Sequence, residues 1–523
     1  MTVTRILTAA QMRRADEITI AEGVSAFDLM DRAGRAVAAV VLNNIPDFGR
    51  VVIITGAGNN GGDGFAAAHY LRKYRVPVTV VSLVGVETLK GASQQHVDLA
   101  LKAGVKIREA ISEDDISELE RWLNRSVVVV DAMFGTGLSR PLQGVMAEAA
   151  ARINVCDRRV ISIDIASGIC ADTGAVLGAA VKADMTIPIA ASKWGHWLAD
   201  GRDYAGELLE AVDIGISDET INASWHASCD CEDDSNCFCV NSTCLINDEY
   251  LTAAWPPRPR LSHKGFFGHV WVFGGSRGYT GAPQLAGLGA YAAGAGLASI
   301  VCPDEVWPIV ASANLEVMAH PESSAAWKSV DAIVAGPGWG MGRDDLLERL
   351  LACDSPMVVD ADALNILAQN SALQDILKTR QAITVMTPHP GEAARLLQCD
   401  IGTVQDNRKQ AVLELVSRFN CWVVLKGSES LVASPERDIY LNPFGSPHMA
   451  VAGSGDVLAG IIGAQLARRK GDGATLAELI SSSVALHAKA GAKGGWYLAG
   501  ELAKLVSDMR QSLERTEVNQ ESK

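Results

Sequence analysis

Basic residues are in the minority in this sequence. Its 523 residues include 46 Lys and Arg against 61 Asp and Glu, which gives a formal net charge of −15. A protein that binds nucleic acid through the phosphate backbone needs a basic surface, so we expect no nucleic-acid partner. An anionic ligand would have to be held by local features, such as helix N-termini and a few well-placed Lys or Arg side chains.

Long apolar runs are also missing. Gly, Pro or charged residues interrupt every apolar run well before the roughly 20 residues that a membrane-spanning helix needs. Residues 1–11 contain no long apolar segment of the kind found in secretory signals. The sequence therefore predicts a cytoplasmic protein with no membrane partner.

Cysteine is sparse outside one stretch. Six of the eleven cysteines are scattered among apolar neighbours, and we expect them to be buried free thiols in a reducing compartment. The other five could bind a soft metal such as zinc, although their pairs are Cys-x-Cys and not the usual Cys-x-x-Cys. A flexible or redox-sensitive insert is the alternative. These five are Cys229, Cys231, Cys237, Cys239 and Cys244.

Segments typical of strands and helices alternate through both halves of the chain. This alternation predicts an α/β fold with two domains, each a parallel sheet covered by helices on both faces. The stretch around 217–243 is polar, acidic and Cys-rich, and a Pro-rich segment follows it. We therefore predict an N-terminal domain over 1–216, a linker over 217–260 and a C-terminal domain over 261–515. In the first domain we expect strands at 51–55, 78–81, 127–131, 160–164 and 185–188.

Three predicted strand ends in the first domain carry Gly-rich or polar segments. They are the run 56–64 with Asn59–Asp63, Asp131 followed by Gly135–Pro141, and Asp164 followed by Ser167. In a parallel sheet these loops would meet at the ligand-binding edge. Their amide, carboxylate and hydroxyl oxygens suit K⁺, Na⁺, Mg²⁺ or Ca²⁺ but not zinc. The alternative is that glycines merely end strands and that Asp and Ser merely cap helices.

The three segments GAGNNGGDGF, DAMFGTGLSRPL and DIASGI together resemble the YjeF N-terminal family of NAD(P)H-hydrate epimerases over residues 8–215. The resemblance implies a Rossmann-like three-layer domain. Asp164 is our candidate acid/base group, because inversion at a hydroxyl-bearing carbon needs proton transfer to and from oxygen. By resemblance, potassium would be held by Asn60, Asp131 and Ser167, and the hydrated nucleotide would contact Asn59, Asn60, Gly61, Gly62, Asp63, Gly135, Thr136, Gly137, Leu138, Ser139, Arg140 and Pro141.

The second half carries six ordered strand-end motifs. They contain Gly274–Ser276, Gly336–Gly340, Asp360–Leu364, Thr387–Glu392, Leu425–Gly427 and Gly453–Asp456. In a Gly-x-Gly-Asp segment that opens a helix, the helix N-terminus stabilises a transferring phosphoryl group and the Asp accepts a proton. The set resembles the ADP-dependent NAD(P)H-hydrate dehydratases of the ribokinase-like fold over 262–510.

That resemblance implies roles for individual residues. Asp456 would activate the added hydroxyl for phosphorylation, and loss of phosphate would regenerate the dihydronicotinamide. Ala282, Gly338 and His389 would contact the hydrated nucleotide. Mg²⁺ is expected for the dehydratase, and ADP would be bound by Lys426, Gly427, Ser428, Glu429, Ser430 and Gly455. The chain departs from the family pattern at Glu429, Val451 and Ala452, so these residues bear on ADP binding and activity.

The predicted function is a bifunctional metabolite-repair enzyme. It would interconvert the R and S hydrates of NADH and NADPH (NADHX and NADPHX) and dehydrate the S form while ADP becomes AMP and phosphate. A homo-oligomer is also expected. Two alternatives stay open. The second half could be a ribokinase-like kinase for a vitamin precursor with Asp456 as base, and the first half could be a non-catalytic binding module.

Overall fold

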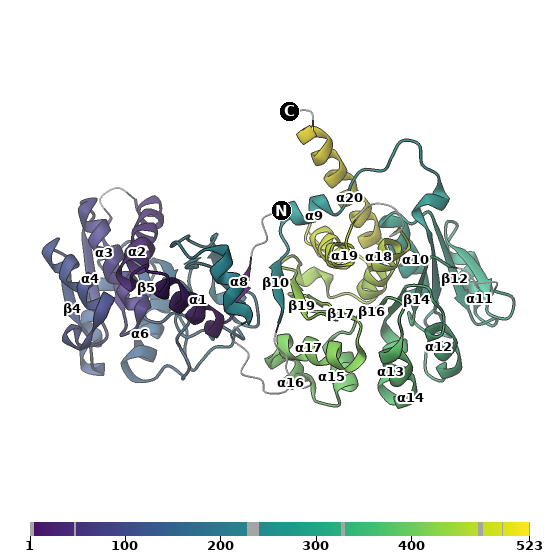
Figure 1. Cartoon of the computed structure of the whole chain (residues 1–523), viewed down its shortest axis with the longest axis horizontal. Coiled ribbons are helices and arrows are strands. Elements are labelled where there is room, and N and C mark those ends of the chain that lie inside the picture. The colour runs from purple at the N-terminus through teal and green to yellow at the C-terminus, as the bar shows by residue number, and fades with distance from the viewer. Residues whose placement is uncertain are drawn as a thin grey trace. The chain divides into compact units, whose positions relative to one another are not determined.

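The computed structural model describes residues 5–46, 49–226, 240–325, 330–468, 474–493 and 495–521. The chain forms two compact units, one ending at Cys237 and the other beginning at Phe238. Each unit is a parallel or mostly parallel sheet with helices on both faces (Figure 1), which confirms the predicted α/β class with two three-layer domains.

The sheet of the N-terminal unit has seven parallel strands in the order β4-β3-β2-β5-β6-β7-β9. Crossovers on both sides of β2 create a point where the strand order reverses, and a ligand crevice forms at such a point. The strands are β2 Val51–Thr55, β3 Val78–Ser82, β4 Lys106–Glu109, β5 Val128–Ala132, β6 Arg159–Ile163, β7 Met185–Ile187 and β9 Glu207–Leu208. Strand β1 (Ile6–Leu7) pairs separately with β8 (Ser192–Lys193).

Helices cover both faces of this sheet. One apolar core packs the sheet against the first four helices and α8, and another packs it against α5 and α6. The helices are α1 Ala9–Ala21, α2 Ala26–Asn43, α3 Asn59–Lys73, α4 Gly91–Lys102, α5 Ile116–Leu123, α6 Gly144–Val155, α7 Gly201–Tyr204 and α8 Asp218–His226. Helix α3 begins at Asn59, inside the Gly-rich run 56–64. The motif's glycines pack closely, since a Cβ on Gly61 would lie 2.1 Å from the Gly56 carbonyl oxygen.

The sheet of the C-terminal unit has ten strands in the order β10-β19-β18-β17-β16-β15-β14-β11-β12-β13. Only β18 runs antiparallel to its neighbours β17 and β19. The strands are β10 Ser242–Leu245, β11 His269–Phe273, β12 Leu297–Cys302, β13 Met318–Pro321, β14 Ala332–Ala335, β15 Met357–Val359, β16 Thr384–Met386, β17 Trp422–Leu425, β18 Leu431–Ala433 and β19 Asp438–Leu441.

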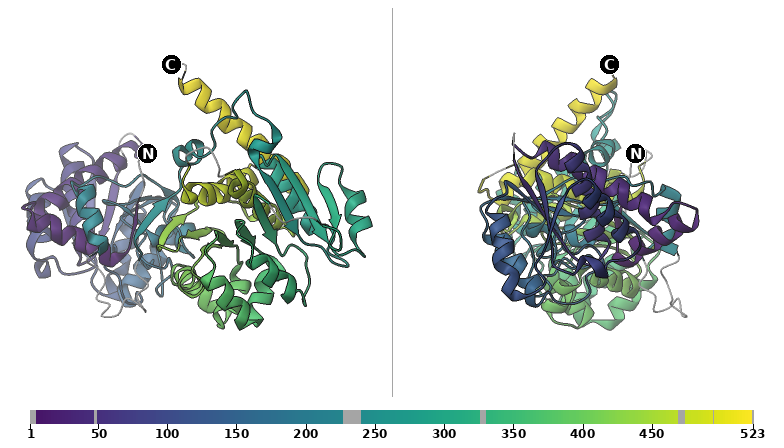
Figure 2. Two further views of the ribbon diagram at one scale, coloured as in Figure 1. Left: turned by 45° about the vertical axis from the view of Figure 1, so that its right-hand side comes forward. Right: turned by 90° about the vertical axis from the view of Figure 1, so that its left-hand side faces the viewer.

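Two groups of helices sandwich this sheet, as both Figure 1 and the left view of Figure 2 show. On one face lie α9 Asp248–Ala253, α10 Ala282–Ala292, α18 Ser454–Arg468, α19 Leu476–Gly491 and α20 Ala499–Glu521. On the other lie α12 Asp344–Leu351, α13 Ala361–Gln369, α14 Ser371–Thr379, α15 Pro390–Leu397, α16 Ile401–Asp406 and α17 Arg408–Phe419. The short α11 (Trp307–Ala313) packs beside β13. Helix α20 continues to Glu521, beyond the predicted domain end at 515.

The predicted linker over 217–260 is wrong in its extent. Helix α8 packs against α1, and its Trp225 joins the N-terminal core. Strand β10 adds a parallel edge to β19, and Trp255 is fully buried in the C-terminal core. Apolar side chains at both ends of the interval, such as Trp225 and Trp255, are buried in the core of one unit or the other. Burial of these side chains makes both ends part of the folded domains. Four of the clustered cysteines, Cys229, Cys231, Cys237 and Cys239, lie outside the described residues.

The remaining cysteines are free thiols, as predicted. Their predicted burial is only partly right. Cys302 and Cys421 are buried, and so is the cluster member Cys244 in β10, whereas Cys156, Cys170, Cys353 and Cys399 are partly exposed. Among the described residues no helix combines the length and the apolar character needed to cross a membrane.

Candidate active sites

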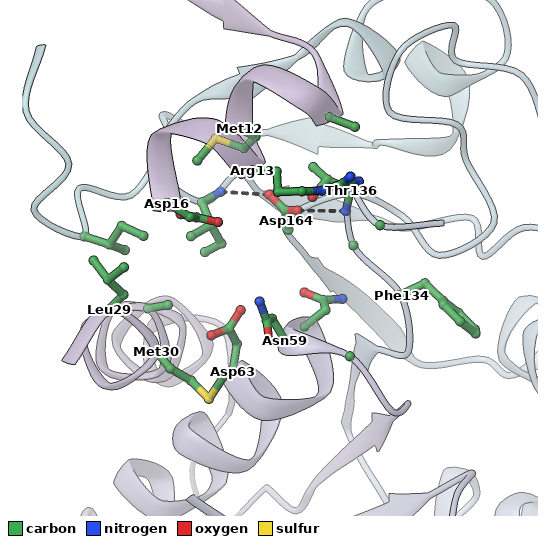
Figure 3. A pocket seen from close by; sticks show the side chains of 18 of the residues that line it. Met12, Arg13, Asp16, Leu29, Met30, Asn59, Asp63, Phe134, Thr136 and Asp164 are labelled. Atoms are coloured by element: carbon green, nitrogen blue, oxygen red, sulfur yellow. Dashed lines mark hydrogen bonds between the residues drawn. The ribbon is translucent and has the colours of Figure 1, made fainter. Parts of the chain in front are cut away.

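The N-terminal unit holds a cavity of about 430 Å³ at the carboxyl ends of its central strands (Figure 3). Side chains from α1, α2 and α3, and from the loops after β5 and β6, form its walls. The loops predicted to converge here therefore do so. Predicted residues that line the cavity are Asn59, Asn60, Asp63, Gly135, Thr136, Gly137, Leu138 and Asp164.

The other predicted substrate contacts lie elsewhere. Gly61 and Gly62 are buried inside α3 and do not line the cavity. Ser139, Arg140 and Pro141 are exposed beyond its rim. Their roles as substrate contacts stay predictions.

Asp164 is the most constrained residue of the cavity. Its φ angle of 66° is unusual for a residue with a side chain. Its carboxylate forms an ion pair with Lys193, whose side chain is 1% exposed, and accepts the Thr136 N–H at 3.3 Å. The Asp164 carbonyl lies 2.7 Å from Nε2 of His196. These contacts hold the backbone and carboxylate of Asp164 in one orientation.

The tautomer of His196 follows from its surroundings. Burial, and then the Lys193 charge, lower the pKa of His196 to about 4, so the ring is neutral. Its Nδ1 accepts the Lys193 backbone N–H at 3.0 Å, which leaves the proton on Nε2 to be donated to the Asp164 carbonyl. Lys193 and His196 escaped the sequence prediction because their segment has no Gly-rich or strand-end motif.

Two further carboxylates, Asp16 of α1 and Asp63 of α3, line the same cavity. Burial raises the pKa of Asp16 to about 6, and nearby Asp164 adds to this against the attraction of Lys193. Burial, followed by repulsion from Asp164 and Asp16, raises the pKa of Asp63 well above its ordinary value. Asp16 was missed because an Asp on an amphipathic helix is usually an exposed surface residue.

Of the predicted cation ligands, Asn60 lines the cavity, whereas Asp131 and Ser167 are fully buried and do not line it. Asp131 accepts hydrogen bonds from the Ser162 hydroxyl at 2.8 Å, and from the hydroxyl and N–H of Ser167 at 2.6 and 2.9 Å. Asn60 is 6% exposed, and neither its Oδ1 nor its Nδ2 has a hydrogen-bond partner in the part of the chain that is described. An unpartnered buried amide needs a ligand, an ion or a water molecule.

Gly135 lies close to both Asp164 and Asn60. A Cβ at this position would lie 2.9 Å from Asp164 Oδ2 and 3.3 Å from Asn60 Cβ. The loop after β5 can therefore pass between the two side chains only because residue 135 is glycine.

The C-terminal site is built around Lys426, at the end of β17. Its ammonium lies 2.7 Å from Asp360 Oδ1 and 3.9 Å from Glu392 Oε2. Asp360 is 1% exposed and also accepts the Thr387 hydroxyl at 2.8 Å. Burial opposes the charge on Lys426, but the carboxylates of Asp360 and Glu392 outweigh it and raise its pKa. Burial raises the pKa of Glu392 to about 7.

Asp456 lies in the first turn of α18, as its motif predicted. Burial and the charge of Asp360 raise its pKa to about 7, against the attraction of Lys426. His487 fixes the start of this helix, because its Nε2 lies 3.0 Å from the Ser454 carbonyl oxygen. Gly455 lies beside Lys426, since a Cβ there would be 3.3 Å from Nζ. A carboxylate, an ammonium and a helix N-terminus therefore meet at one point.

The other predicted substrate contacts lie on the loops around this point. Ala282 begins α10, and its Cβ would lie 3.1 Å from a Cβ on Gly338. His389 caps α15, where its Nδ1 accepts the Gly391 N–H at 3.0 Å and its own N–H donates to Glu392 at 2.8 Å. His389 is therefore a helix cap in this structure, and its contact with the substrate stays a prediction.

A buried arginine missed by the sequence prediction organises the Lys426–Ser430 loop. Arg408 is 7% exposed and donates to the carbonyls of Leu425, Lys426 and Glu429 at 3.2–3.3 Å. The Glu429 carboxylate accepts a hydrogen bond from the Ser428 hydroxyl. This neighbouring residue therefore holds the Glu429 side chain, which is one of the departures from the family pattern. Val451 packs partly against the C-terminal core, whereas no contact explains Ala452.

The N-terminal and C-terminal units match two different family models. The family model for the YjeF-related protein N-terminus matches residues 26–195, and that for NAD(P)H-hydrate dehydratase matches residues 270–506. A bifunctional NAD(P)H-hydrate repair enzyme of Coxiella burnetii is 32% identical over 95% of this chain and 96% of its own length. The chain belongs to the bifunctional NAD(P)H-hydrate repair enzyme family.

Two further relatives extend the comparison. The enzyme of this family from Moorella thermoacetica is 34% identical over 87% of both chains. A solved structure of an ADP/ATP-dependent NAD(P)H-hydrate dehydratase from Bacillus subtilis, co-crystallised with ATP and Mg²⁺, is 27% identical. It covers 51% of this chain and 98% of its own, with a TM-score of 0.45.

Proposed function

We propose that this chain repairs hydrated nicotinamide nucleotides. The N-terminal unit interconverts the R and S hydrates of NADH and NADPH, and the C-terminal unit dehydrates the S form as ADP becomes AMP and phosphate. The observation that carries the proposal is the pair of sites in one chain, each with an acidic side chain beside a buried lysine. Membership of the repair-enzyme family supports it.

Asp164 is the proton-transfer group of the first site. The Lys193 ammonium pairs with its carboxylate and holds it in position at the cavity. Asn59, Asn60, Asp63 and Gly135–Leu138 contact the hydrated nucleotide, and the start of α3 offers N–H groups to its phosphates.

The donor atoms of the predicted cation ligands suit a potassium ion. The unpartnered Asn60 oxygen, the buried Asp131 carboxylate and the Ser167 hydroxyl are the hard oxygen ligands that such an ion needs. Bound there, K⁺ would balance the charge of Asp131. Asn60, Asp131 and Ser167 would hold the ion, while the two serines keep Asp131 in place.

In the second site Asp456 accepts the proton of the substrate hydroxyl as that oxygen is phosphorylated, and the N-terminus of α18 stabilises the phosphoryl group. The loop Lys426–Ser430 and Gly455 bind ADP, while Ala282, Gly338 and His389 bind the hydrate. The carboxylates of Asp360 and Glu392 are already paired with Lys426, so we expect Mg²⁺ to enter with the ADP phosphates and not to occupy a preformed protein site.

The test is recovery of dihydronicotinamide absorbance from mixed R and S NADH hydrate with ADP, Mg²⁺ and K⁺. The wild type should recover all of the substrate, Asp164→Asn about the fraction present as S, and Asp456→Asn none. Arg14→Gln, a change on the exposed face of α1, is the matched control and should behave as the wild type.

Failure of the wild type to recover absorbance would contradict the proposal. A stable phosphorylated product from the Asp456 site would instead support the alternative of a small-molecule kinase. Unchanged recovery in Asp164→Asn would support a non-catalytic N-terminal module.

A further inference from the structure

The epimerase cavity contains more acid/base groups than one proton-transfer residue requires. Asp16, Asp63 and Asp164 line it from three different elements. Figure 3 shows Asp164 and Asp63 on opposite sides of the open space, with Asp16 projecting from α1. The Lys193 ammonium, the one ammonium among the residues that line this cavity, is already paired with Asp164 and with the Ile189 carbonyl oxygen at 2.6 Å.

The carboxylates of Asp16 and Asp63, unlike that of Asp164, have no such partner among the described residues. No hydrogen bond or ion pair within 4 Å holds either of them in the described part of the chain. Besides Lys193 and Asp164, the charged residues near them are Arg13, at the exposed edge of the cavity, and Glu17, which adds a smaller repulsion to Asp16. The lining residues from α2, α4 and the loop after β5 carry no charge. Asp63 therefore faces two acidic neighbours and no cation of its own.

We propose that Asp63 is a second proton-transfer group of the epimerase, placed across the cavity from Asp164, and that Asp16 keeps Asp63 protonated. The inference rests on the proposed epimerase function. Two carboxyl groups whose surroundings push their protonation states apart can act as acid and base in one site. Burial and the nearby Asp164 and Asp16 raise the pKa of Asp63, which agrees with a carboxylic acid at neutral pH.

The chemistry of the hydrate explains why two groups on opposite sides are needed. Water adds to an enamine so that the hydroxyl sits on the carbon bonded to nitrogen. Asp63 donates its proton to this hydroxyl, the C–O bond breaks, and its electron pair leaves with the oxygen as water. The lone pair of the ring nitrogen forms a C=N bond at the same time.

Water then adds to the opposite face of that carbon. Its proton passes to the Asp164 carboxylate, a new C–O bond forms, and the C=N electron pair returns to nitrogen. The carbon is inverted, one proton has moved from Asp63 to Asp164, and exchange with solvent restores both groups. In the reverse direction the two groups exchange roles.

The test uses the full-length protein and the isolated R hydrate of NADH without ADP, so that the dehydratase does not consume the product. Epimerisation is followed by chromatography across a range of pH for the wild type, Asp63→Asn, Asp16→Asn and the control Glu17→Gln. Glu17 lies next to Asp16 but is exposed and pairs with Arg14 at 3.2 Å. The wild type is also run in H₂¹⁸O.

Asp63→Asn should lose about 100-fold or more of the epimerisation rate at every pH, the usual contribution of a general acid. Asp16→Asn should epimerise at the wild-type rate at low pH. Its rate should begin to fall at a lower pH than that of the wild type, because Asp63 loses its proton more easily once the repelling charge of Asp16 is gone. Glu17→Gln should shift the profile much less than Asp16→Asn does, because Glu17 is exposed and adds only the smallest of the repulsions on Asp16. Each inversion should place one ¹⁸O atom in the hydrate.

Retention of the rate within threefold in Asp63→Asn, or inversion without ¹⁸O, would overturn the proposal. If Asp63→Asn does not fold, the pH shift of Asp16→Asn decides, and no shift overturns it. A wild type that does not epimerise contradicts the proposed function itself, which separates the two failures.

Discussion

Lys426 Nζ lies 2.7 Å from Asp360 Oδ1, and this contact joins the end of β17 to the end of β15. Glu392 and Asp456 also act on the same ammonium. One buried cation therefore balances three carboxyl groups in the C-terminal site.

Removal of that cation should be damaging. Lys426→Met should abolish measurable dehydration of the S hydrate and lower the unfolding temperature, because a buried carboxylate that loses its partner is strongly destabilising. Lys493→Met, at an exposed position, is the control and should change neither. Steady-state rates and thermal unfolding check both expectations, and an active Lys426→Met would contradict this role.

The pH dependence of the C-terminal unit should have opposite signs for activity and stability. Asp456 must lose its proton to act as a base, so dehydration should rise as pH rises through about 7. The pKa of Asp456 is about 7 in the folded state and 3.8 in the unfolded chain, so the folded state binds this proton more tightly. The stability that the bound proton contributes is therefore present below pH 3.8 and is lost as the pH rises to about 7. Rate profiles and urea unfolding at pH 5 and 8 measure the two effects.

Asp456→Asn separates these effects further. It should remove activity but make unfolding less dependent on pH over that interval, because the group that titrates is gone. A variant whose stability varies with pH as steeply as the wild type would show that other groups, such as Glu392, account for the dependence.

The pair of Lys193 and Asp164 should be coupled in stability. Lys193→Met leaves a buried carboxylate unpaired and should cost about 3–5 kcal/mol in the N-terminal unit. Lys193→Met combined with Asp164→Asn removes both charges and should cost less than Lys193→Met alone. Urea unfolding of the four proteins in a double-mutant cycle tests this, and simple additivity would contradict a direct interaction.

Epimerisation should depend on K⁺ through Asn60. Replacing K⁺ by tetramethylammonium, which is too large for the site, should slow epimerisation of the isolated R hydrate. Asn60→Ala should require more K⁺ for half-maximal rate, because a buried amide oxygen is lost as a ligand. Asn124→Ala, at the exposed end of α5, should respond to K⁺ as the wild type does.

The sequence was most informative where a strand is followed by a loop with glycine or a carboxylate. Strand β2 matches its predicted range, and the motifs of Asp164 and Asp456 lie at strand ends or helix starts as expected. Local pattern suffices there because strand burial and turn chemistry are both short-range properties.

The partners of those residues could not be predicted in the same way. Lys193 is 29 residues from Asp164, and Lys426 is 66 residues from Asp360. Only the three-dimensional packing of the sheets pairs them. The linker prediction failed for a related reason, since the apolar residues of α8 and Trp255 become meaningful only when a core is there to receive them.

The edge strand β10 decides how the two activities can be separated genetically. A gene fragment that begins at residue 261 would delete β10, α9 and Trp255, leaving β19 as an open sheet edge that invites aggregation. A cut between His226 and Val240 leaves every described element with its own unit. Expression of the two halves as separate polypeptides should therefore succeed only from that interval.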